Sequence, residues 1–198
     1  LLHNSNQHTN EITCIRSYID LIASASRDTT ITIWRTTPPN TYQFVRKLTG
    51  GHADVVNDIL FLSSTELLST SSDDKTVKWN INTGTNSIYY IFVRDFYSIR
   101  LLSNNFIAIA LENQPIIYSE IQLWNYTTGA RLQSLKAHKS NIKYFEEVDD
   151  RYLISVDFSN IINIWDYKNY RLVAHIEDYC GDNFAMAVLN QGSKYHII

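Results

Sequence analysis

Four tryptophans recur at a nearly constant spacing, and this period constrains the fold more than any other feature of the chain. Trp34, Trp79, Trp124 and Trp165 are separated by 45, 45 and 41 residues, and each ends a strand-like run such as Ile31-Thr32-Ile33-Trp34. A period of about 40–45 residues with several short strands in it is the spacing of β-propeller blades. The chain is therefore expected to repeat one small sheet four times.

A second marker runs in phase with the tryptophans. His8, His52 and His138 precede the first, second and fourth tryptophan by 26, 27 and 27 residues. Short apolar runs separated by turn residues fill each period, and no helical period competes with them. The prediction is an all-β chain of four-stranded antiparallel sheets, with repeats at about 8–51, 52–91, 92–137 and 138–179 and a partial repeat at 180–198.

Composition limits the partners that such a chain can have. Hydrophobic residues make up 44% and charged residues 19% of the sequence, which is ordinary for a globular protein, and the net charge is −3 without a block of like charges. Neither nucleic acid nor a membrane is therefore an expected partner. The two cysteines, Cys14 and Cys180, make no disulfide framework, which favours a reducing compartment: the cytoplasm, or alternatively the nucleus.

The repeats resemble the WD repeats of the β-propeller family. The resemblance rests on Gly51-His52, Ala137-His138, the turn Ser26-Arg27-Asp28 and the pair Trp165-Asp166. It implies radially stacked four-stranded blades. Four repeats with partial pieces at both ends predict an open arc instead of a closed ring. The chain is expected to be a fragment of something longer.

In that family a histidine, a serine or threonine, an aspartate and the tryptophan form a structural hydrogen-bonded tetrad in each blade. In the second repeat Asp74 lies one residue too close to its tryptophan, so Asp73 is the alternative partner. The fourth repeat has Ser159 where the aspartate is expected, and the third has Phe92 and Tyr118 at the histidine and aspartate positions. The expected tetrad members are His8, Ser24, Asp28 and Trp34; His52, Thr70, Asp74 and Trp79; and His138, Ser155 and Trp165.

The resemblance also implies where a partner binds. In WD-like propellers ligands meet the narrow face near the central channel, through the residue before the turn aspartate and the residues three and five after the histidine. The third repeat is aligned by its apolar residues. The expected partner-binding residues are Glu11, Thr13, Arg27, Val55, Asn57, Asp73, Asp95, Tyr97, Asn141, Lys143 and Phe158.

No catalytic constellation is found in the sequence. Three of the six histidines occupy one repeat position, which indicates a structural role, so no metal is expected. No glycine-rich phosphate-binding loop is present, so neither a cofactor nor a small-molecule substrate is expected. The predicted function is a non-catalytic scaffold that binds other proteins or peptides.

Two alternatives stay open. In the leading alternative, the chain is a regulatory sensor or substrate-receptor segment of a larger multidomain protein, such as a signalling NTPase or a ubiquitin-ligase adaptor. The adaptor alternative draws on Ile164-Trp165-Asp166-Tyr167-Lys168, which partly matches a docking box of ubiquitin-ligase receptors. A less favoured alternative is an enzymatic propeller with its active site in other blades.

Overall fold

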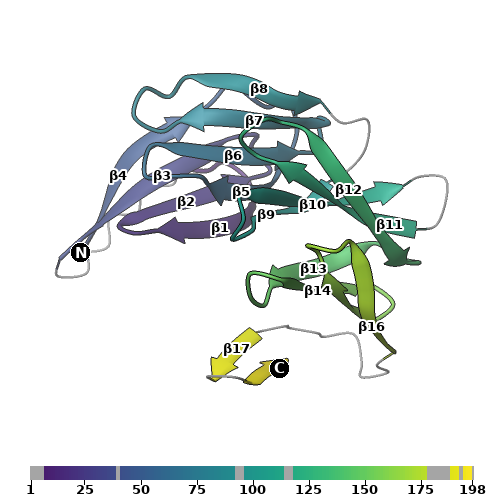
Figure 1. Ribbon diagram of the computed structural model, residues 1–198. Coiled ribbons are helices and arrows are strands. Elements are labelled where there is room, and N and C mark those ends of the chain that lie inside the picture. The colour runs from purple at the N-terminus through teal and green to yellow at the C-terminus, as the bar shows by residue number, and fades with distance from the viewer. Residues whose placement is uncertain are drawn as a thin grey trace. The chain divides into compact units, whose positions relative to one another are not determined.

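A computed structural model describes residues 7–38, 41–91, 96–113, 118–177, 188–191 and 194–197, and every regular element in these ranges is a β-strand (Figure 1). The strands form four four-stranded sheets and one two-stranded sheet. The chain divides into two compact units, Leu1–Ile99 and Arg100–Ile198. The all-β class of four-stranded antiparallel sheets is confirmed.

The first unit contains two complete sheets in which strands pair in chain order, as short turns between antiparallel strands dictate. The first sheet consists of β1 (Ile12–Tyr18), β2 (Leu21–Ser26), β3 (Ile31–Thr37) and β4 (Thr41–Leu48). The second consists of β5 (Val56–Phe61), β6 (Glu66–Ser71), β7 (Lys75–Asn80) and β8 (Asn86–Ile91).

The third and fourth sheets follow the same order. The third consists of β9 (Phe96–Leu101), β10 (Phe106–Asn113), β11 (Tyr118–Asn125) and β12 (Arg131–His138), and the unit boundary falls within β9. The fourth consists of β13 (Ile142–Glu147), β14 (Tyr152–Asp157), β15 (Ile161–Asp166) and β16 (Arg171–Glu177). The two-stranded sheet pairs β17 (Val188–Gln191) with β18 (Lys194–Ile197).

In each unit a large apolar core lies between two sheets. In the first unit the small side chains of Ala23 and Ala25 in β2 belong to the same buried cluster as Ile59 and Trp79 of the second sheet. Small residues on one face leave room for the bulky tryptophan on the other, which gives close packing between the sheets.

The second unit repeats this arrangement with different residues. Ala108 and Ala110 of β10 share a buried cluster with Phe145 and Trp165 of the fourth sheet. In both units, a sheet face that bears alanines therefore shares a core with a sheet face that bears a tryptophan.

The turn between the second and third strand has the same backbone conformation in three repeats. The residue five before the tryptophan has a positive φ: 69° at Thr29, 63° at Asp74 and 59° at Asn160. Aspartate and asparagine tolerate this left-handed conformation better than most residues. Asp74 therefore occupies the tip of a turn.

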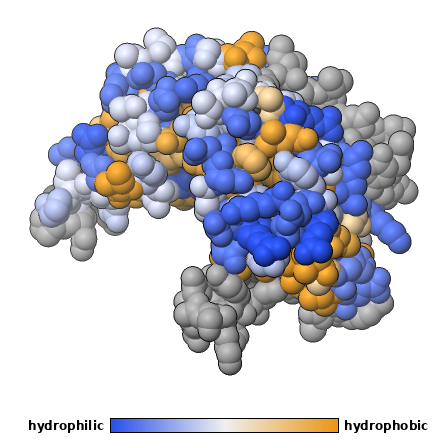
Figure 2. All heavy atoms as spheres, viewed as in Figure 1, coloured by the Kyte–Doolittle hydropathy of each residue, from blue (hydrophilic) through white to orange (hydrophobic). Residues whose placement is uncertain are grey.

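The side of the molecule in Figure 2 is mainly hydrophilic, with separate apolar patches. Large exposed apolar residues include Ile12 and Ile15 of β1, Tyr42 of β4 and Phe158. No helix long and apolar enough to cross a membrane occurs in the described part of the chain. The expected open arc stays a prediction.

Candidate functional site

The second repeat contains a continuous buried network of polar side chains. The indole N–H of Trp79 donates to Ser69 Oγ at 2.7 Å, and Ser69 Oγ lies 2.7 Å from His52 Nε2. On the other side of the ring, His52 Nδ1 lies 3.1 Å from Asp73 Oδ1. With the histidine proton placed on Nδ1, each group donates to the next, from indole to hydroxyl to imidazole to carboxylate.

Two members of this network differ from the sequence expectation, which named Thr70 and Asp74. Successive side chains of a strand point to opposite faces, so a shift of one residue moves the side chain away from the histidine. Ser69 and Asp73 lie ten and six residues before Trp79, as Ser24 and Asp28 lie before Trp34. Thr70 is buried on the other face, and Asp74 lies at the turn tip.

Electrostatics keep the histidine neutral and the carboxylate charged. Burial lowers the pKa of His52 and outweighs the attraction of Asp73. Burial works to raise the pKa of Asp73, but the backbone N–H of Ala53, His52 and Lys75 together hold it below its ordinary value. The position before His52 must also be small, because a Cβ at Gly51 would lie 2.5 Å from the Trp79 ring.

The fourth repeat builds the same network with an aspartate from another position. Trp165 donates its indole N–H to Ser155 Oγ at 2.8 Å, and Ser155 Oγ lies 2.6 Å from His138 Nε2. His138 Nδ1 lies 3.0 Å from Asp157 Oδ2, and Asp157 is fully buried. Ser159, at the position expected for aspartate, donates its backbone N–H to Asp157 instead. The sequence signal was present, since Asp157 stands two residues after Ser155 on the same face of the strand.

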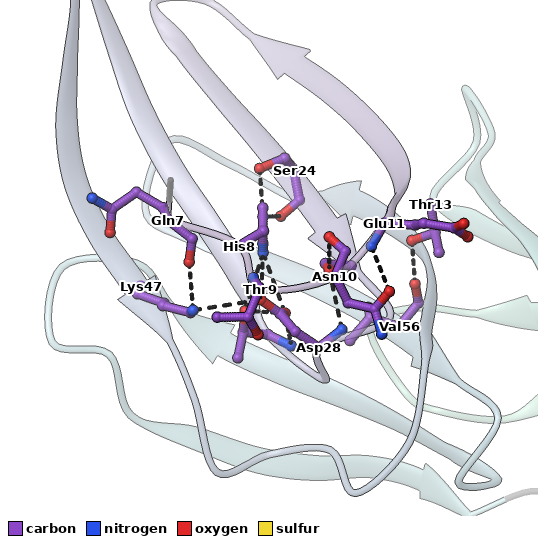
Figure 3. A network of polar contacts seen from close by, with 12 residues as sticks. Gln7, His8, Thr9, Asn10, Glu11, Thr13, Ser24, Asp28, Lys47 and Val56 are labelled. Carbon is purple, nitrogen blue, oxygen red and sulfur yellow. Dashed lines mark hydrogen bonds and ion pairs between the residues drawn. The ribbon is translucent and has the colours of Figure 1, made fainter. Parts of the chain in front are cut away.

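The first repeat has the same residue types but an incomplete network (Figure 3). His8 lies between Ser24 Oγ at 2.8 Å and Asp28 Oδ2 at 3.1 Å, and Lys47 approaches Asp28 at 3.5 Å. Burial works to raise the pKa of Asp28, but hydrogen bonds from the Thr30 hydroxyl, the Thr9 backbone and His8 outweigh it and hold that pKa well below its usual range.

Trp34 of this repeat stands apart from the network. Among the described residues it makes no hydrogen bond to Ser24, and it is half-buried with its ring edge-on to Phe44. It lines a hollow of about 390 Å³ together with His8, Ile12, Ile15 and other residues of the first sheet.

The third repeat has no serine at this place. Strand pairing aligns Ile107 with Trp124 as Ile22 is aligned with Trp34, so Ile109 occupies the position of Ser24. Ile109 is buried. Phe92 lies outside the described residues, as does the side chain of Tyr118.

The expected partner-binding residues come together in pairs at one edge of three sheets. The residue before the tetrad aspartate position donates its backbone N–H to the carbonyl three residues after the histidine. The three bonds are Arg27 to Glu11 at 2.9 Å, Ser72 to Val55 at 3.0 Å and Phe158 to Asn141 at 2.9 Å. These six residues, with Thr13, Asn57 and Lys143 two positions further along the first strands, are called the turn face below.

One expected member of this face is replaced. Asp73 belongs to the buried network, and Ser72 takes its place on the turn face because the aspartate that binds His52 stands one residue earlier than Asp74. Asp95 and the side chain of Tyr97 lie outside the described residues.

The turn face carries different chemistry in different repeats. Arg27 and Glu11, both exposed, form an ion pair at 3.0 Å. Asn57 donates from Nδ2 to Ser72 Oγ at 3.1 Å, and the Thr13 hydroxyl donates to the carbonyl of Val56. In the fourth repeat the face consists of the exposed ring of Phe158 beside Asn141 and Lys143.

A buried carboxylate that the sequence analysis missed joins three strands of the first unit. Asp58 in β5 accepts hydrogen bonds from Cys14 Sγ at 2.9 Å, Ser98 Oγ at 2.9 Å and the Ile99 backbone N–H at 3.1 Å, and pairs with Arg16 at 2.7 Å. Burial, with the charge of Asp58, raises the pKa of Cys14 to about 12. The thiol is thus protonated and acts as a structural donor, not as a nucleophile.

The segment that partly matches a docking box is used within its own sheet. Asp166 is fully buried and accepts hydrogen bonds from Asn169 Nδ2 and from Arg151 Nη2, both at 2.9 Å. These two partners hold the pKa of Asp166 well below its usual range. No group of three or more potential metal ligands occurs among the described residues.

Sequence comparison identifies the first two repeats. The family described as "WD domain, G-beta repeat" matches residues 1–35 and 42–79. The chain is 36% identical over 67 residues to the "Cross-pathway control WD-repeat protein 2" of Flammulina velutipes, covering 33% of this chain and 21% of that protein. It is 36% identical over 83 residues to the "Small ribosomal subunit protein RACK1" of Medicago sativa, covering 39% of this chain and 26% of that protein.

Solved structures share the fold over most of the chain. The WD40 β-propeller domain of Doa1 superposes with a TM-score of 0.73 at 18% identity, covering 87% of this chain and 55% of that chain. The computationally designed Ika8 protein superposes with a TM-score of 0.74 at 20% identity, covering 92% of this chain and 54% of that one.

The fold and the repeated histidine networks define a chain of β-propeller blades. Residues 1–79 match the WD-repeat family, and the expected resemblance is confirmed by this match and by the WD-repeat relatives. It spans about a quarter of the length of these curated relatives or less, and about half of the superposed structures.

Proposed function

We propose that the chain is a non-catalytic scaffold that presents the turn face to partner proteins or peptides. The single observation that carries the proposal is the recurrent backbone bond between turn and first strand in three repeats, which positions exposed side chains in the first and fourth repeats and half-buried ones in the second. A rigid sheet that positions variable side chains on turns is a common basis for recognition.

The turn face fits recognition better than chemistry. The buried polar groups next to the turn face are bonded within each sheet as structural networks, while the face itself carries an ion pair, amide side chains and an exposed aromatic ring. Exposed aromatic and arginine side chains are frequent among residues that dominate binding energy at protein interfaces.

Site-specific photo-crosslinking in cells tests this proposal. A photoreactive phenylalanine analogue is placed at Arg27 and Phe158 on the turn face, and at Tyr42 in β4 and Val173 in β16 as exposed controls. Discrete adducts at the two turn-face positions, without the same adducts at the control positions, are expected. Adducts at the control positions alone, or none at Arg27 and Phe158, would contradict the proposal.

A purified partner then allows a quantitative test. Phe158→Ser is expected to weaken its binding by at least about tenfold, because truncation of an aromatic anchor commonly costs about 2 kcal/mol or more, and tenfold corresponds to about 1.4 kcal/mol. Tyr42→Ser serves as a matched control, since it also removes an exposed ring. Titration calorimetry measures both variants, and thermal melts verify that each is folded.

A further inference from the structure

The fourth repeat combines an exposed aromatic ring with unpaired positive charge. Phe158 lies in the turn between β14 and β15, strands that pair along their length, and 58% of the residue is exposed. Its backbone N–H donates to the carbonyl of Asn141, which ties the turn to the start of β13. The Phe158 patch is defined here as Lys139, Asn141, Lys143 and Phe158.

Two lysines stand two residues before and two residues after Asn141, the residue bonded to this turn. Lys143 follows Asn141 by two residues in β13 and is half-buried, whereas Lys139 follows His138 and is exposed. The residue after the histidine lies beside the turn in the first two repeats, where Thr9 and Ala53 donate their backbone N–H to the turn aspartate at 2.9 and 2.8 Å. Neither lysine forms an ion pair with any residue that the structure describes.

The first repeat shows that such charge is satisfied internally when an acid is available. There Arg27 stands at the position of Phe158 and Glu11 at that of Asn141, and the two pair at 3.0 Å. In the fourth repeat the acid is replaced by an amide, and the Asn141 side chain accepts a hydrogen bond from Ser119 Oγ at 3.2 Å. No acid therefore stands in the fourth repeat at the position from which Glu11 pairs with Arg27 in the first.

We propose that the Phe158 patch binds an acidic peptide segment that carries an apolar side chain next to its carboxylates. This inference rests on the proposed function and names the partner of the turn face in the fourth repeat. The ring offers an apolar anchor, and the lysines select carboxylates by charge complementarity. Nucleic acid also combines negative charge with groups that stack, but the chain has a net charge of −3 and no basic stripe to follow a phosphate backbone.

Selection from a random linear peptide library against the whole chain tests the inference without assuming a sequence. Peptides with a net negative charge and an aromatic or aliphatic residue are expected to be enriched. Fluorescence anisotropy with one enriched peptide then compares the variants. Phe158→Ser should weaken binding by at least about tenfold, and Lys139→Ser and Lys143→Ser by about threefold each, more at low salt. Lys168→Ser is the matched control, because Lys168 is exposed but paired with Asp150.

The outcomes separate this inference from the proposed function. Enriched peptides that are neutral or basic and lose affinity on Phe158→Ser would retain the turn face as a binding site and overturn the acidic partner. Enriched peptides that bind Phe158→Ser as well as the parent would overturn the patch itself. No enrichment, or tighter binding of an oligothymidine probe than of any acidic peptide, would also overturn it. Thermal melts of all variants verify folding.

Discussion

The first and second repeats carry the same four polar and aromatic residue types, with serine and aspartate at the same spacings from the tryptophan, yet only the second assembles them completely. The His52 side chain is fully enclosed and the Trp79 indole donates to Ser69. In the first repeat His8 reaches Ser24 and Asp28, but Trp34 is half-buried beside a hollow and does not join them. Residue identity alone does not make the network.

The difference follows from what covers each sheet. Val56 and Ile59 on the second sheet are fully buried, with the alanine-bearing face of the first sheet in the same core. Ile12 and Ile15, at the same positions of the first sheet, are 53% and 58% exposed. Hydrogen bonds are stronger and unpaired groups more costly where water is excluded, so the covered network should contribute more to stability.

The largest expected effect contrasts the two tryptophans. Trp79→Ala should lower the free energy of unfolding by about 3–5 kcal/mol, because it removes a fully buried ring and the donor to Ser69. Trp34→Ala should cost at most about half as much, since its ring already faces the hollow. Urea unfolding of both variants measures the difference, and equal losses would show that the first sheet is covered in solution.

The next contrast lies within the second repeat. Asp73→Ala should destabilise the fold by about 1–3 kcal/mol, because it leaves His52 Nδ1 and the Ala53 backbone N–H without their acceptor. Asp74→Asn is the control, since asparagine tolerates the positive φ of the turn tip, and it should be neutral to within about 0.5 kcal/mol. A larger loss from Asp74→Asn than from Asp73→Ala would contradict the assignment.

The free energy of unfolding should also depend on pH through the buried imidazole of His52. The pKa of His52 is lowered below 6.5 in the folded state, so the unfolded chain takes up a proton first as the pH falls. This contribution is complete above pH 6.5 and is lost below it, by up to about 1.4 kcal/mol per pH unit. The lowered pKa of Asp73 adds a second loss below pH 3.8.

Replacing His52 by glutamine separates the contribution of His52 to the pH dependence of stability from that of Asp73. Urea unfolding at about pH 7.5 and about pH 5.5 should show a smaller difference in His52→Gln than in the parent chain, because the variant has no imidazole to protonate in the unfolded state. The same difference in both chains would mean that a group other than His52 causes the loss of stability below pH 6.5.

Repeat spacing predicted the four-stranded sheets and the histidine and tryptophan of the second and fourth networks, because these residues recur at the blade period, but not that Trp34 stays outside its network. It placed Thr70 and Asp74 wrongly because a slip of one residue exchanges the faces of a strand. Asp157 was missed because the carboxylate that reaches the repeat's histidine comes from a different position in the fourth repeat than in the first. Asp58 was beyond prediction, since its partners come from strands far apart in the sequence.

The smallest expected effect tests whether Ser69 and not Thr70 is the hydroxyl that bonds His52. The Thr70 side chain is buried on the face opposite Ser69, and its hydroxyl has no partner within the described part of the chain. The first and fourth repeats carry Ala25 and Val156 at this position, so the fold accepts an apolar side chain there. Thr70→Val keeps the shape and removes an unsatisfied hydroxyl, and it should stabilise the chain by about 0.5–1 kcal/mol.

Ser69→Ala is the matched substitution one residue away. It removes the acceptor of Trp79 and a partner of His52, so it should destabilise by about 1–3 kcal/mol, opposite in sign to Thr70→Val. Urea unfolding at neutral pH resolves the two signs. If Thr70→Val were the destabilising member of the pair, the threonine would be the hydroxyl that bonds the histidine, and the second repeat would be built as its sequence first suggested.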